Sequence, residues 1–431
     1  MKEYPKYKSS GLNWIDTIPS HWSCVRAQYL FDIVSGSTPN SNDESLWDGN
    51  INWITPADFN TDDHYIYKGK RTITQKGYNS CSTTILPIGS IIFSKRAPIG
   101  KVVITSDVLC TNQGCFGCSP NKDLSSNYFY YLMSILESEY NVLGSGSTFM
   151  EISAKEFRNF KLLVPPVNEQ KAIARYLDVV TAKVDALMSE KRAQVEDLWK
   201  YRTSLITETV TRGLNPTTPI RQTNSEWYPN IPYNWNIEKF KYQASIKANL
   251  VHPEDYTQHP QISPDSIEKN TGRLLGYRSV EESGIISDNH LFFKGQIIYS
   301  KIRPNLNKVI IAPFDGLCSA DMYPIETSNN VRYFQYLMLS NPFVSQVSVV
   351  IQDRVKMPKI NQLELGEIFI VVPPISEQQE IADYLDEKTE KIDSLVEELE
   401  AQLKDLATYK QAVITEAVTG KVDVRDWKPN N

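Results

Sequence analysis

A stretch of sequence occurs twice in this chain: residues 164–211 read VPPVNEQKAIARYLDVVTAKVDALMSEKRAQVEDLWKYRTSLITETVT, and residues 372–419 read VPPISEQQEIADYLDEKTEKIDSLVEELEAQLKDLATYKQAVITEAVT. At a fixed offset of 208 the two copies align without a gap, and 25 of 48 positions are identical. A repeat of this length places the same structural unit at two positions, which predicts a pseudo-symmetric molecule. Such proteins tend to act on pseudo-symmetric targets, of which double-helical DNA is the commonest.

Each copy has the pattern of a long amphipathic helix, because apolar residues recur at steps of three and four. In the first copy these are Ile173, Leu177, Val180, Val184, Leu187, Val195, Leu198 and Leu205, with Thr209 closing the run and Lys191 and Arg202 interrupting it; in the second they are Ile381, Leu385, Ile392, Leu395, Leu399, Leu403, Leu406 and Val413. The Pro-Pro pairs predict the helix starts, with Asn168 and Ser376 as N-caps, and Gly213 and Gly420 predict the ends. The alternative, an ordinary core helix, is usually far shorter.

The rest of the chain is doubled more loosely. Short motifs recur in order: Trp14, Ile18–Pro19 and Trp22 as Trp227, Ile231–Pro232 and Trp235; Gly89–Lys95 as Gly295–Lys301; Tyr128–Met133 as Tyr333–Met338. Short β-rich runs between turn-rich loops predict an α+β protein with two mixed α/β globules. The expected order is a globule at 1–163, a helix at 164–213, a linker at 214–230, a globule at 231–371, a helix at 372–421 and a tail at 422–431.

Composition limits the class of protein. No apolar run of the 431 residues approaches the length of a membrane span, and the N-terminal MKEYPKYKSS contains no hydrophobic signal segment. The six cysteines fall five to one between the globules, which does not suggest a disulfide framework, so we expect a cytoplasmic protein. Cys110, Cys115 and Cys118 are a candidate set of zinc ligands, but one Cys-x-x-Cys without a second pair is a weak signal, and we expect no metal.

The net charge of −6 argues against a DNA-binding protein, but basic residues gather at matching places in the two globules. In each globule a strand ending in Ser-Lys opens onto a polar, proline-bent loop, which suits the presentation of Arg, Lys and Asn to phosphates and base edges. Residues 144–148 and 353–356, nearer each helix, offer hydroxyls, backbone amides or cations. The candidate DNA-binding residues are Lys95, Arg96, Lys101, Ser147, Thr148, Lys301, Arg303, Asn305, Lys308, Arg354 and Lys356. Any one of them alone also fits a solvated surface loop.

Motifs for catalysis are absent from the sequence. It contains no Gly-x-x-x-x-Gly-Lys-Ser/Thr for ATP, no Gly-x-Gly-x-x-Gly for a dinucleotide, and no Asn/Asp-Pro-Pro-aromatic run of the kind that adenine methyltransferases use. The nearest approach to the last, Ser340–Phe343, is one proline short. We therefore expect no catalytic residue in this chain.

Two variable globules, each followed by PP-x-x-EQ-x-x-IA-x-YLD and a closing Ile-Thr-Glu-x-Val-Thr, resemble the specificity subunit of type I restriction–modification systems. The resemblance covers essentially the whole chain. It implies that each globule is a target-recognition domain that reads one half of a split DNA site. Because the globules differ in sequence, we expect the two half-sites to differ, which makes the whole site asymmetric. It also implies that the two helices form an antiparallel coiled coil that sets the distance between the half-sites and docks the partner subunits.

The resemblance implies as partners double-stranded DNA, two modification (methyltransferase) subunits and, in the full complex, restriction/translocase subunits. S-adenosylmethionine, ATP and Mg would then act on the partner subunits. We expect the outward helix surfaces to contact the methyltransferases through Glu169, Gln170, Tyr176, Glu377, Gln378 and Tyr384.

Two other functions stay open. A stand-alone nuclease or methyltransferase would modify DNA as a pure chain. A purely structural coiled-coil adaptor would fail to bind DNA even together with its partner.

Overall fold

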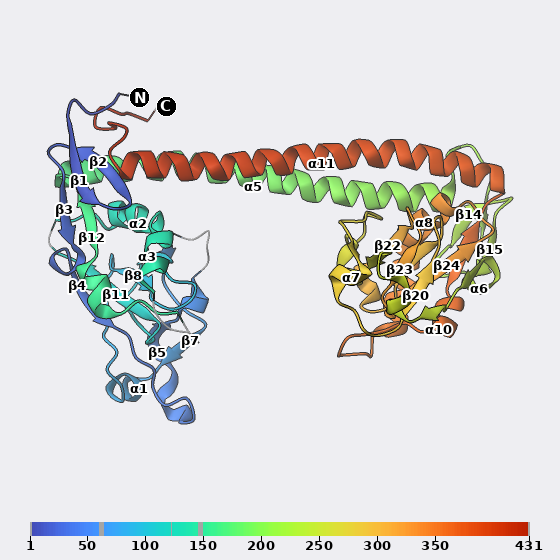
Figure 1. Cartoon of the computed structure of the whole chain (residues 1–431), viewed down its shortest axis with the longest axis horizontal. Helices are drawn as coiled ribbons and strands as arrows, with labels where there is room; N and C mark the ends of the chain where they lie inside the picture. Colours follow the sequence, from blue (N-terminus) through green and yellow to red (C-terminus); the bar gives the residue numbers. More distant parts are fainter. Residues whose placement is uncertain (1, 60–63, 122, 145–149, 430–431) are drawn as a thin grey trace. The chain divides into compact units, whose positions relative to one another are not determined.

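The computed structural model describes residues 2–59, 64–121, 123–144 and 150–429 (Figure 1). The chain divides into two compact units, residues 1–190 with 402–431 and residues 191–401. Each unit therefore contains one globule and part of both long helices. Within the described ranges, no helix is both long and apolar enough to cross a membrane.

The repeated sequence forms two long helices, α5 (Val167–Arg212) and α11 (Ile375–Val418). The carbonyl of Pro166 accepts the first hydrogen bonds of α5, from the backbone N–H groups of residues 169 and 170. Asn168 and Ser376 lie inside the first turns, so their prediction as N-cap residues is wrong. Both helices end close to the predicted glycines: α5 ends directly before Gly213 and α11 ends two residues before Gly420. The φ angles of these glycines, 77° and 72°, are in the left-handed region that glycine adopts readily.

The helices are antiparallel within each unit (Figure 1). In the first unit, Ile173 near the start of α5 shares a hydrophobic core with Val418 at the end of α11. In the second unit, Val210 near the end of α5 shares a core with Ile381 near the start of α11. This confirms the predicted antiparallel pairing.

The prediction that the apolar residues of each helix all face the other helix is wrong at one pair of equivalent positions. Leu187 and Leu395 are about half exposed, whereas Val184 and Val396 are buried. Because 187 and 395 differ by the repeat offset of 208, the exposure itself is a repeated feature.

The two globules share four antiparallel strands of their central sheets. The strand order is β4–β11–β8–β9 in the first globule and β16–β24–β21–β22 in the second, and the first sheet adds β6, parallel to β9. The strands are β4 (Phe31–Ser35), β11 (Cys115–Pro120), β8 (Ile91–Ser94), β9 (Val102–Thr105), β16 (Ala244–Ile246), β24 (Met322–Thr327), β21 (Ile297–Ser300) and β22 (Val309–Ile311). The mixed α/β, pseudo-symmetric fold predicted from the sequence is confirmed.

Further elements surround each central sheet. In the first globule they are β1 (Tyr7–Leu12), β2 (Ile15–Pro19), β3 (Ser23–Arg26), β5 (Trp47–Ile54), β6 (Tyr65–Ile66), β7 (Arg71–Ile73), β10 (Leu109–Thr111), β12 (Lys161–Val164), α1 (Gln75–Asn79), α2 (Ser126–Ser134), α3 (Glu137–Leu143) and α4 (Ala154–Asn159). In the second they are β13 (Ile220–Gln222), β14 (Asn230–Pro232), β15 (Asn236–Lys239), β17 (Leu250–Val251), β18 (Pro260–Ile262), β19 (Arg278–Ser279), β20 (Asn289–Phe292), β23 (Gly316–Cys318), β25 (Phe369–Val372), α6 (Phe240–Gln243), α7 (Val280–Ser283), α8 (Val331–Leu339), α9 (Asn341–Ile351) and α10 (Gln362–Gly366).

The predicted linker and tail are partly folded onto the globules. Within 214–230, strand β13 pairs with β14 and Tyr228 is buried in the core of the second unit. Within 422–431, the Asp423 N–H donates to the Lys2 carbonyl at 2.8 Å, and Trp427 packs edge-on against Tyr176 at 5.1 Å between ring centroids. Apolar side chains in both segments explain why neither remains a free connector.

Candidate nucleic-acid interface

Two loops of the second globule, about fifty residues apart in sequence, lie side by side. Residues 301–308 follow β21, and residues 352–359 follow α9. The Arg303 N–H donates to the Pro358 carbonyl at 2.7 Å, and the Ile360 N–H donates to the Lys301 carbonyl at 3.0 Å. We call 301–308 with 352–359 the second loop pair. It brings together two segments that each contain candidate DNA-binding residues and that the sequence did not show to be neighbours.

The first globule has the equivalent arrangement. Residues 94–101 begin at the last residue of β8, and the Ile152 N–H donates to the Lys95 carbonyl at 3.0 Å, as the Ile360 N–H does to the Lys301 carbonyl. Arg96 and Glu151 form a β-bridge. We call 94–101 with 150–152 the first loop pair. Ser147 and Thr148, also predicted to bind DNA, lie outside the described residues.

The cations of the first loop pair are held by carboxylates. Lys95 and Arg96 both bind Glu151, at 2.9 and 2.8 Å, and Lys101 binds Glu137 at 2.8 Å. Partial burial acts to raise the pKa of Glu151, but the hydrogen bonds from Lys95 and Arg96 outweigh it and hold that pKa below its usual value. Glu151 therefore stays ionised and fixes both cations at the start of the loop.

The second loop pair is more open. Lys308 is mostly buried and donates to the Pro264 carbonyl at 2.6 Å, while Arg354 is paired with Glu364. Lys301 lies 5.1 Å from the ring centroid of Tyr323. Arg303, Asn305 and Lys356 are exposed, and within the described part of the chain no ion pair engages Arg303 or Lys356.

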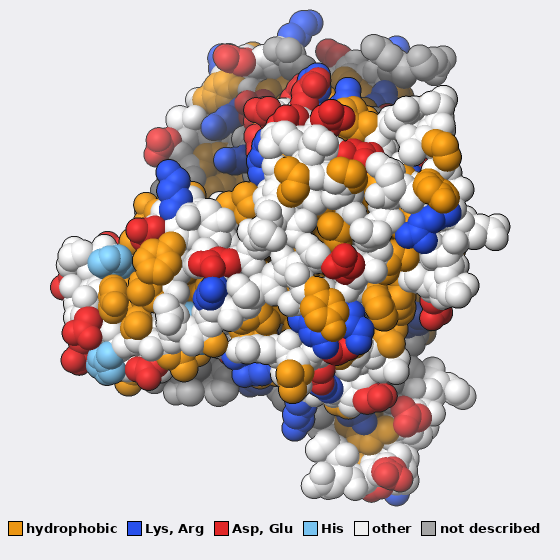
Figure 2. All heavy atoms as spheres, turned by 90° about the vertical axis from the view of Figure 1, so that its right-hand side faces the viewer, with side chains coloured by type: hydrophobic (Ala, Val, Ile, Leu, Met, Phe, Trp, Pro, Cys, Tyr) orange, Lys and Arg blue, Asp and Glu red, His pale blue; other side chains and the backbone are white. Residues whose placement is uncertain are grey.

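Charge is mixed on the face of the second unit that Figure 2 shows. Lys and Arg side chains are scattered there among acidic and uncharged ones and do not form one large basic patch. Any contact with DNA phosphates on this face would therefore be local.

The prediction that Glu169 and Gln170 lie on an outward helix surface is wrong, because both side chains are buried against their own globule. Glu169 accepts hydrogen bonds from the Trp22 indole at 3.1 Å and lies 2.8 Å from the His21 imidazole. Gln170 accepts from the Ser125 N–H at 3.1 Å and donates to the Pro165 carbonyl at 2.9 Å. The Trp22 indole N–H and the Ser125 backbone N–H thereby gain hydrogen-bond partners inside the core.

The second unit repeats these contacts. Glu377 accepts from the Trp235 indole at 2.9 Å. Gln378 is buried, accepts from the Asn330 N–H at 2.9 Å and donates to the Pro373 carbonyl at 2.9 Å. The Glu-Gln dipeptide of each copy thus fixes a globule to its helix. The prediction that Gln378 lies on an outward helix surface is therefore also wrong.

The two predicted tyrosines differ. Tyr176 is buried beside Trp427. Tyr384 is half-buried, with the Lys388 ammonium 5.5 Å from its ring centroid. Of the two, only Tyr384 offers surface to a partner.

A family model described as the type I restriction modification DNA specificity domain matches residues 19–197 and 236–405. The chain belongs to this family. It is 31% identical over 323 residues to the type I restriction enzyme EcoDI specificity subunit of Escherichia coli, covering 72% of each chain. It is 27% identical over 432 residues to the type I restriction enzyme MjaIX specificity subunit of Methanocaldococcus jannaschii, covering 96% of each.

One solved structure from work on complex assembly and conformational transition of the type I R-M system has the same fold. Its TM-score is 0.69 at 13% identity, over 94% of this chain and 99% of that one. At this identity the likeness concerns the fold alone.

Sequence reasoning missed a second repeated anchor in this type I specificity chain. The Tyr131 hydroxyl donates to Asp178 at 2.8 Å, and the Tyr336 hydroxyl donates to Asp386 at 2.8 Å. Burial raises the pKa of both phenols, so they remain neutral donors at ordinary pH. The signal was present, since both tyrosines belong to the recurring Tyr-Phe-x-Tyr-Leu-Met motif, but that motif does not name the partner.

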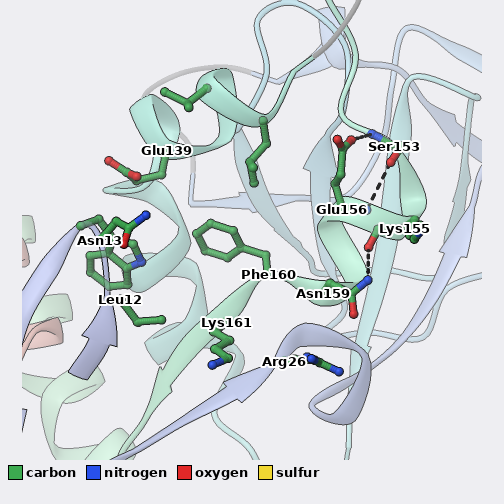
Figure 3. Close-up of a pocket in the computed structure, with 13 residues that line it drawn as sticks. Leu12, Asn13, Arg26, Glu139, Ser153, Lys155, Glu156, Asn159, Phe160 and Lys161 are labelled. Atoms are coloured by element: carbon green, nitrogen blue, oxygen red, sulfur yellow. Dashed lines mark hydrogen bonds between the residues drawn. The ribbon is translucent and has the colours of Figure 1, made fainter. Parts of the chain in front are cut away.

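A separate hollow of about 640 Å³ opens on the first globule of this type I specificity chain (Figure 3). Figure 3 shows Phe160 facing it, with Glu139 on α3 and Lys161 on β12 at its sides. Glu156 is bonded to the Ser153 N–H at 3.0 Å, as the cap of α4. The described lining residues include none of the residues predicted to bind DNA or a partner.

Cys110, Cys115 and Cys118 are buried thiols, and each lies in a different hydrophobic cluster of the first globule. Burial raises the pKa of Cys110 to about 12 and also raises that of Cys115 and Cys118. Within the described ranges, no group of three or more His, Cys, Asp or Glu side chains is arranged to hold a metal ion.

Proposed function

We propose that this chain reads a bipartite, asymmetric DNA site with one globule on each half-site, and that it docks adenine methyltransferase subunits and, through them, restriction subunits. The observation that carries the proposal is that the first and the second loop pair occupy equivalent places in the two globules. Both follow the same strand of the same sheet and are closed by the same backbone hydrogen bond, from Ile152 to Lys95 and from Ile360 to Lys301. One frame used twice suits two halves of one duplex.

Different side chains on this common frame support different half-sites. The first loop pair presents Lys95 and Arg96 bound to Glu151, whereas the second presents Arg303 and Lys356 without an ion pair among the described residues. Because base edges are distinguished by donors, acceptors and methyl groups, unlike loops select unlike sequences. The site as a whole is then asymmetric.

Two pairs of exposed apolar residues support docking of two like partners. Leu187 and Leu395 are equivalent in the repeat, and so are Tyr201 and Tyr409; all four are about half exposed. In the first unit the ion pair between Lys410 and Asp185, at 2.6 Å, places Leu187 and Tyr409 at the same level of the helix pair. Exposed Leu and Tyr at repeated positions suit two copies of one protein surface better than the buried Glu-Gln pairs do.

The helices are proposed to set the spacer between the half-sites. Inserting one heptad into α5 alone is expected to change the length of the unread spacer in the recognised site. An insertion of the same length between residues 214 and 219, outside the helices, is the matched control and is expected to leave the spacer unchanged. Equal spacers in all three proteins would contradict the spacer role.

Catalysis is proposed to belong to the partners, because the sequence lacks the phosphate-binding and methyltransferase motifs that the chemistry needs. S-adenosylmethionine, ATP and Mg would then be bound by those subunits. The test is transfer of a labelled methyl group to DNA by the chain alone, by the methyltransferase alone and by both together. Site-specific transfer only by the mixture supports the proposal; transfer by the chain alone indicates an enzyme, and unselective transfer by the mixture indicates an adaptor.

A further inference from the structure

The tip of the second loop pair exposes apolar side chains. Val355 is 95% exposed and Met357 is 55% exposed, on either side of Lys356. Apolar side chains displayed singly on a surface need no explanation, but two of them at the tip of a short loop favour burial against another molecule.

The backbone at this tip is held in an uncommon conformation. Among the described residues, the non-glycine residues with positive φ are Asp48, Asp123, Asn270, Arg303, Asn307 and Met357. Asp and Asn tolerate the left-handed region, whereas Arg and Met rarely adopt it. Both exceptions, Arg303 with φ of 44° and Met357 with φ of 47°, lie in the second loop pair, where the Arg303 N–H donates to the Pro358 carbonyl at 2.7 Å. Strain concentrated at one place and fixed by a hydrogen bond is typical of a binding site.

The charges around the tip favour DNA over a protein partner. Arg303 and Lys356 are exposed cations without an ion pair among the described residues, while Arg354 is neutralised by Glu364 and Asp353 is an exposed acid. An apolar tip flanked by free cations matches a DNA groove, where thymine methyl groups lie between two rows of phosphates.

We infer that Val355 and Met357 read thymine methyl groups in the half-site of the second globule, while Arg303 and Lys356 bind the flanking phosphates. This inference rests on the proposed function and names the residues that read one half-site. Readout by apolar contact differs from readout by Arg or Asn hydrogen bonds, because it is lost when a single methyl group is removed from the DNA.

The test uses the complex of the full chain with its methyltransferase and synthetic duplexes that contain the recognised motif. Each thymine of each half-site is replaced in turn by deoxyuridine, which removes only the 5-methyl group. For the wild-type complex, we expect a loss of affinity of about 4-fold per methyl group at one or two positions of a single half-site. With Val355→Ser, that sensitivity to deoxyuridine should disappear at the contacted position.

The matched control is Ile286→Ser, in the same globule, where the side chain is 89% exposed outside the loop pair. It should keep the wild-type sensitivity to deoxyuridine. Arg303→Gly removes the cation, and glycine tolerates the positive φ at this position. This variant should weaken binding to all DNA sequences alike, and the dependence of log K on log salt concentration should become less steep by about 1, as expected for the loss of one phosphate contact.

The outcomes separate this inference from the proposed function. If the wild-type complex recognises no motif at all, the proposed function fails. If it recognises a motif but tolerates every deoxyuridine, or if the half-site contains no thymine, only the inference fails. If Val355→Ser loses the methyltransferase subunit instead, the tip is a protein contact and the inference is overturned.

Discussion

Arg202 of α5 and Asp393 of α11 form an ion pair that is buried in the second unit, with an Nε–Oδ1 distance of 2.9 Å and side chains 4% and 9% exposed. The repeat offset of 208 carries Arg202 onto Lys410 and Asp393 onto Asp185, and these two residues also pair, at 2.6 Å in the first unit. That second pair is open to solvent. One helix register thus serves both units. In the second unit a globule loop covers the ion pair, because Arg202 also donates to the Thr271 carbonyl at 2.9 Å.

Arg202→Met is expected to destabilise the second unit by about 3 kcal/mol, because it leaves Asp393 and the Thr271 carbonyl without their buried partner. The cost stays at the lower end for a broken buried pair, since Arg273 remains 3.0 Å from Asp393. Lys410→Met removes the equivalent exposed pair and should cost less than about 1 kcal/mol. Urea unfolding of the full chain measures both, with amide exchange in α8 and α2 reporting the two units separately. Equal costs for the two variants would contradict the difference in burial.

Gln170→Ala and Gln378→Ala should each lower stability by about 2–3 kcal/mol, because each leaves buried backbone groups without their hydrogen-bond partner. The neighbouring exposed residues provide the controls Lys171→Ala and Glu380→Ala, which should leave the unfolding transition nearly unchanged. If the glutamine variants unfolded like wild type and lost only the methyltransferase, these side chains would belong to the partner interface and not to the support of the globules.

Acid should weaken the first unit through His64. Burial, helped by the charge of Lys410 and opposed by that of Asp178, lowers its pKa from an ordinary 6.5 to about 4. Between these values the unfolded chain binds a proton that the folded chain does not, so stability falls as pH drops from 6.5 toward 4, by up to about 3 kcal/mol. His64→Phe keeps the stacking on Tyr130, where the ring centroids are 3.8 Å apart, and should reduce this pH dependence. The measurement is the free energy of unfolding in urea at several pH values. If this free energy fell equally with decreasing pH in both proteins, His64 would not be the cause of the acid sensitivity.

Leu187→Lys and Leu395→Lys should each remove one methyltransferase subunit from the complex, and the double variant should remove both. Neither change should unfold the free chain, because both side chains are about half exposed. Ala182→Lys introduces the same charge about 140° away around α5 and should keep both subunits. Native mass spectrometry of the assembled complex counts them. Two subunits retained by the double variant would exclude this surface as the docking site.

The sequence predicted the repeated helices to within three residues at each end, because Pro-Pro and Gly punctuate them and their apolar period is long. It did not predict which way Glu169 and Gln170 face. Their identity in both copies shows that the positions are constrained, but the Trp22 that binds Glu169 lies 147 residues away, and only the fold brings it there. The contact between the loops 301–308 and 352–359 could not be predicted either, because the loops are far apart in sequence and only the fold brings them together.

The most direct measurement is a genome-wide map of methylated adenines in a strain that expresses this chain with its methyltransferase, compared with a strain that lacks only this chain. We expect methylation in one bipartite, asymmetric motif, abolished when the chain is absent. Unchanged methylation without the chain, with the methyltransferase shown to be expressed and active, would contradict the role in DNA recognition.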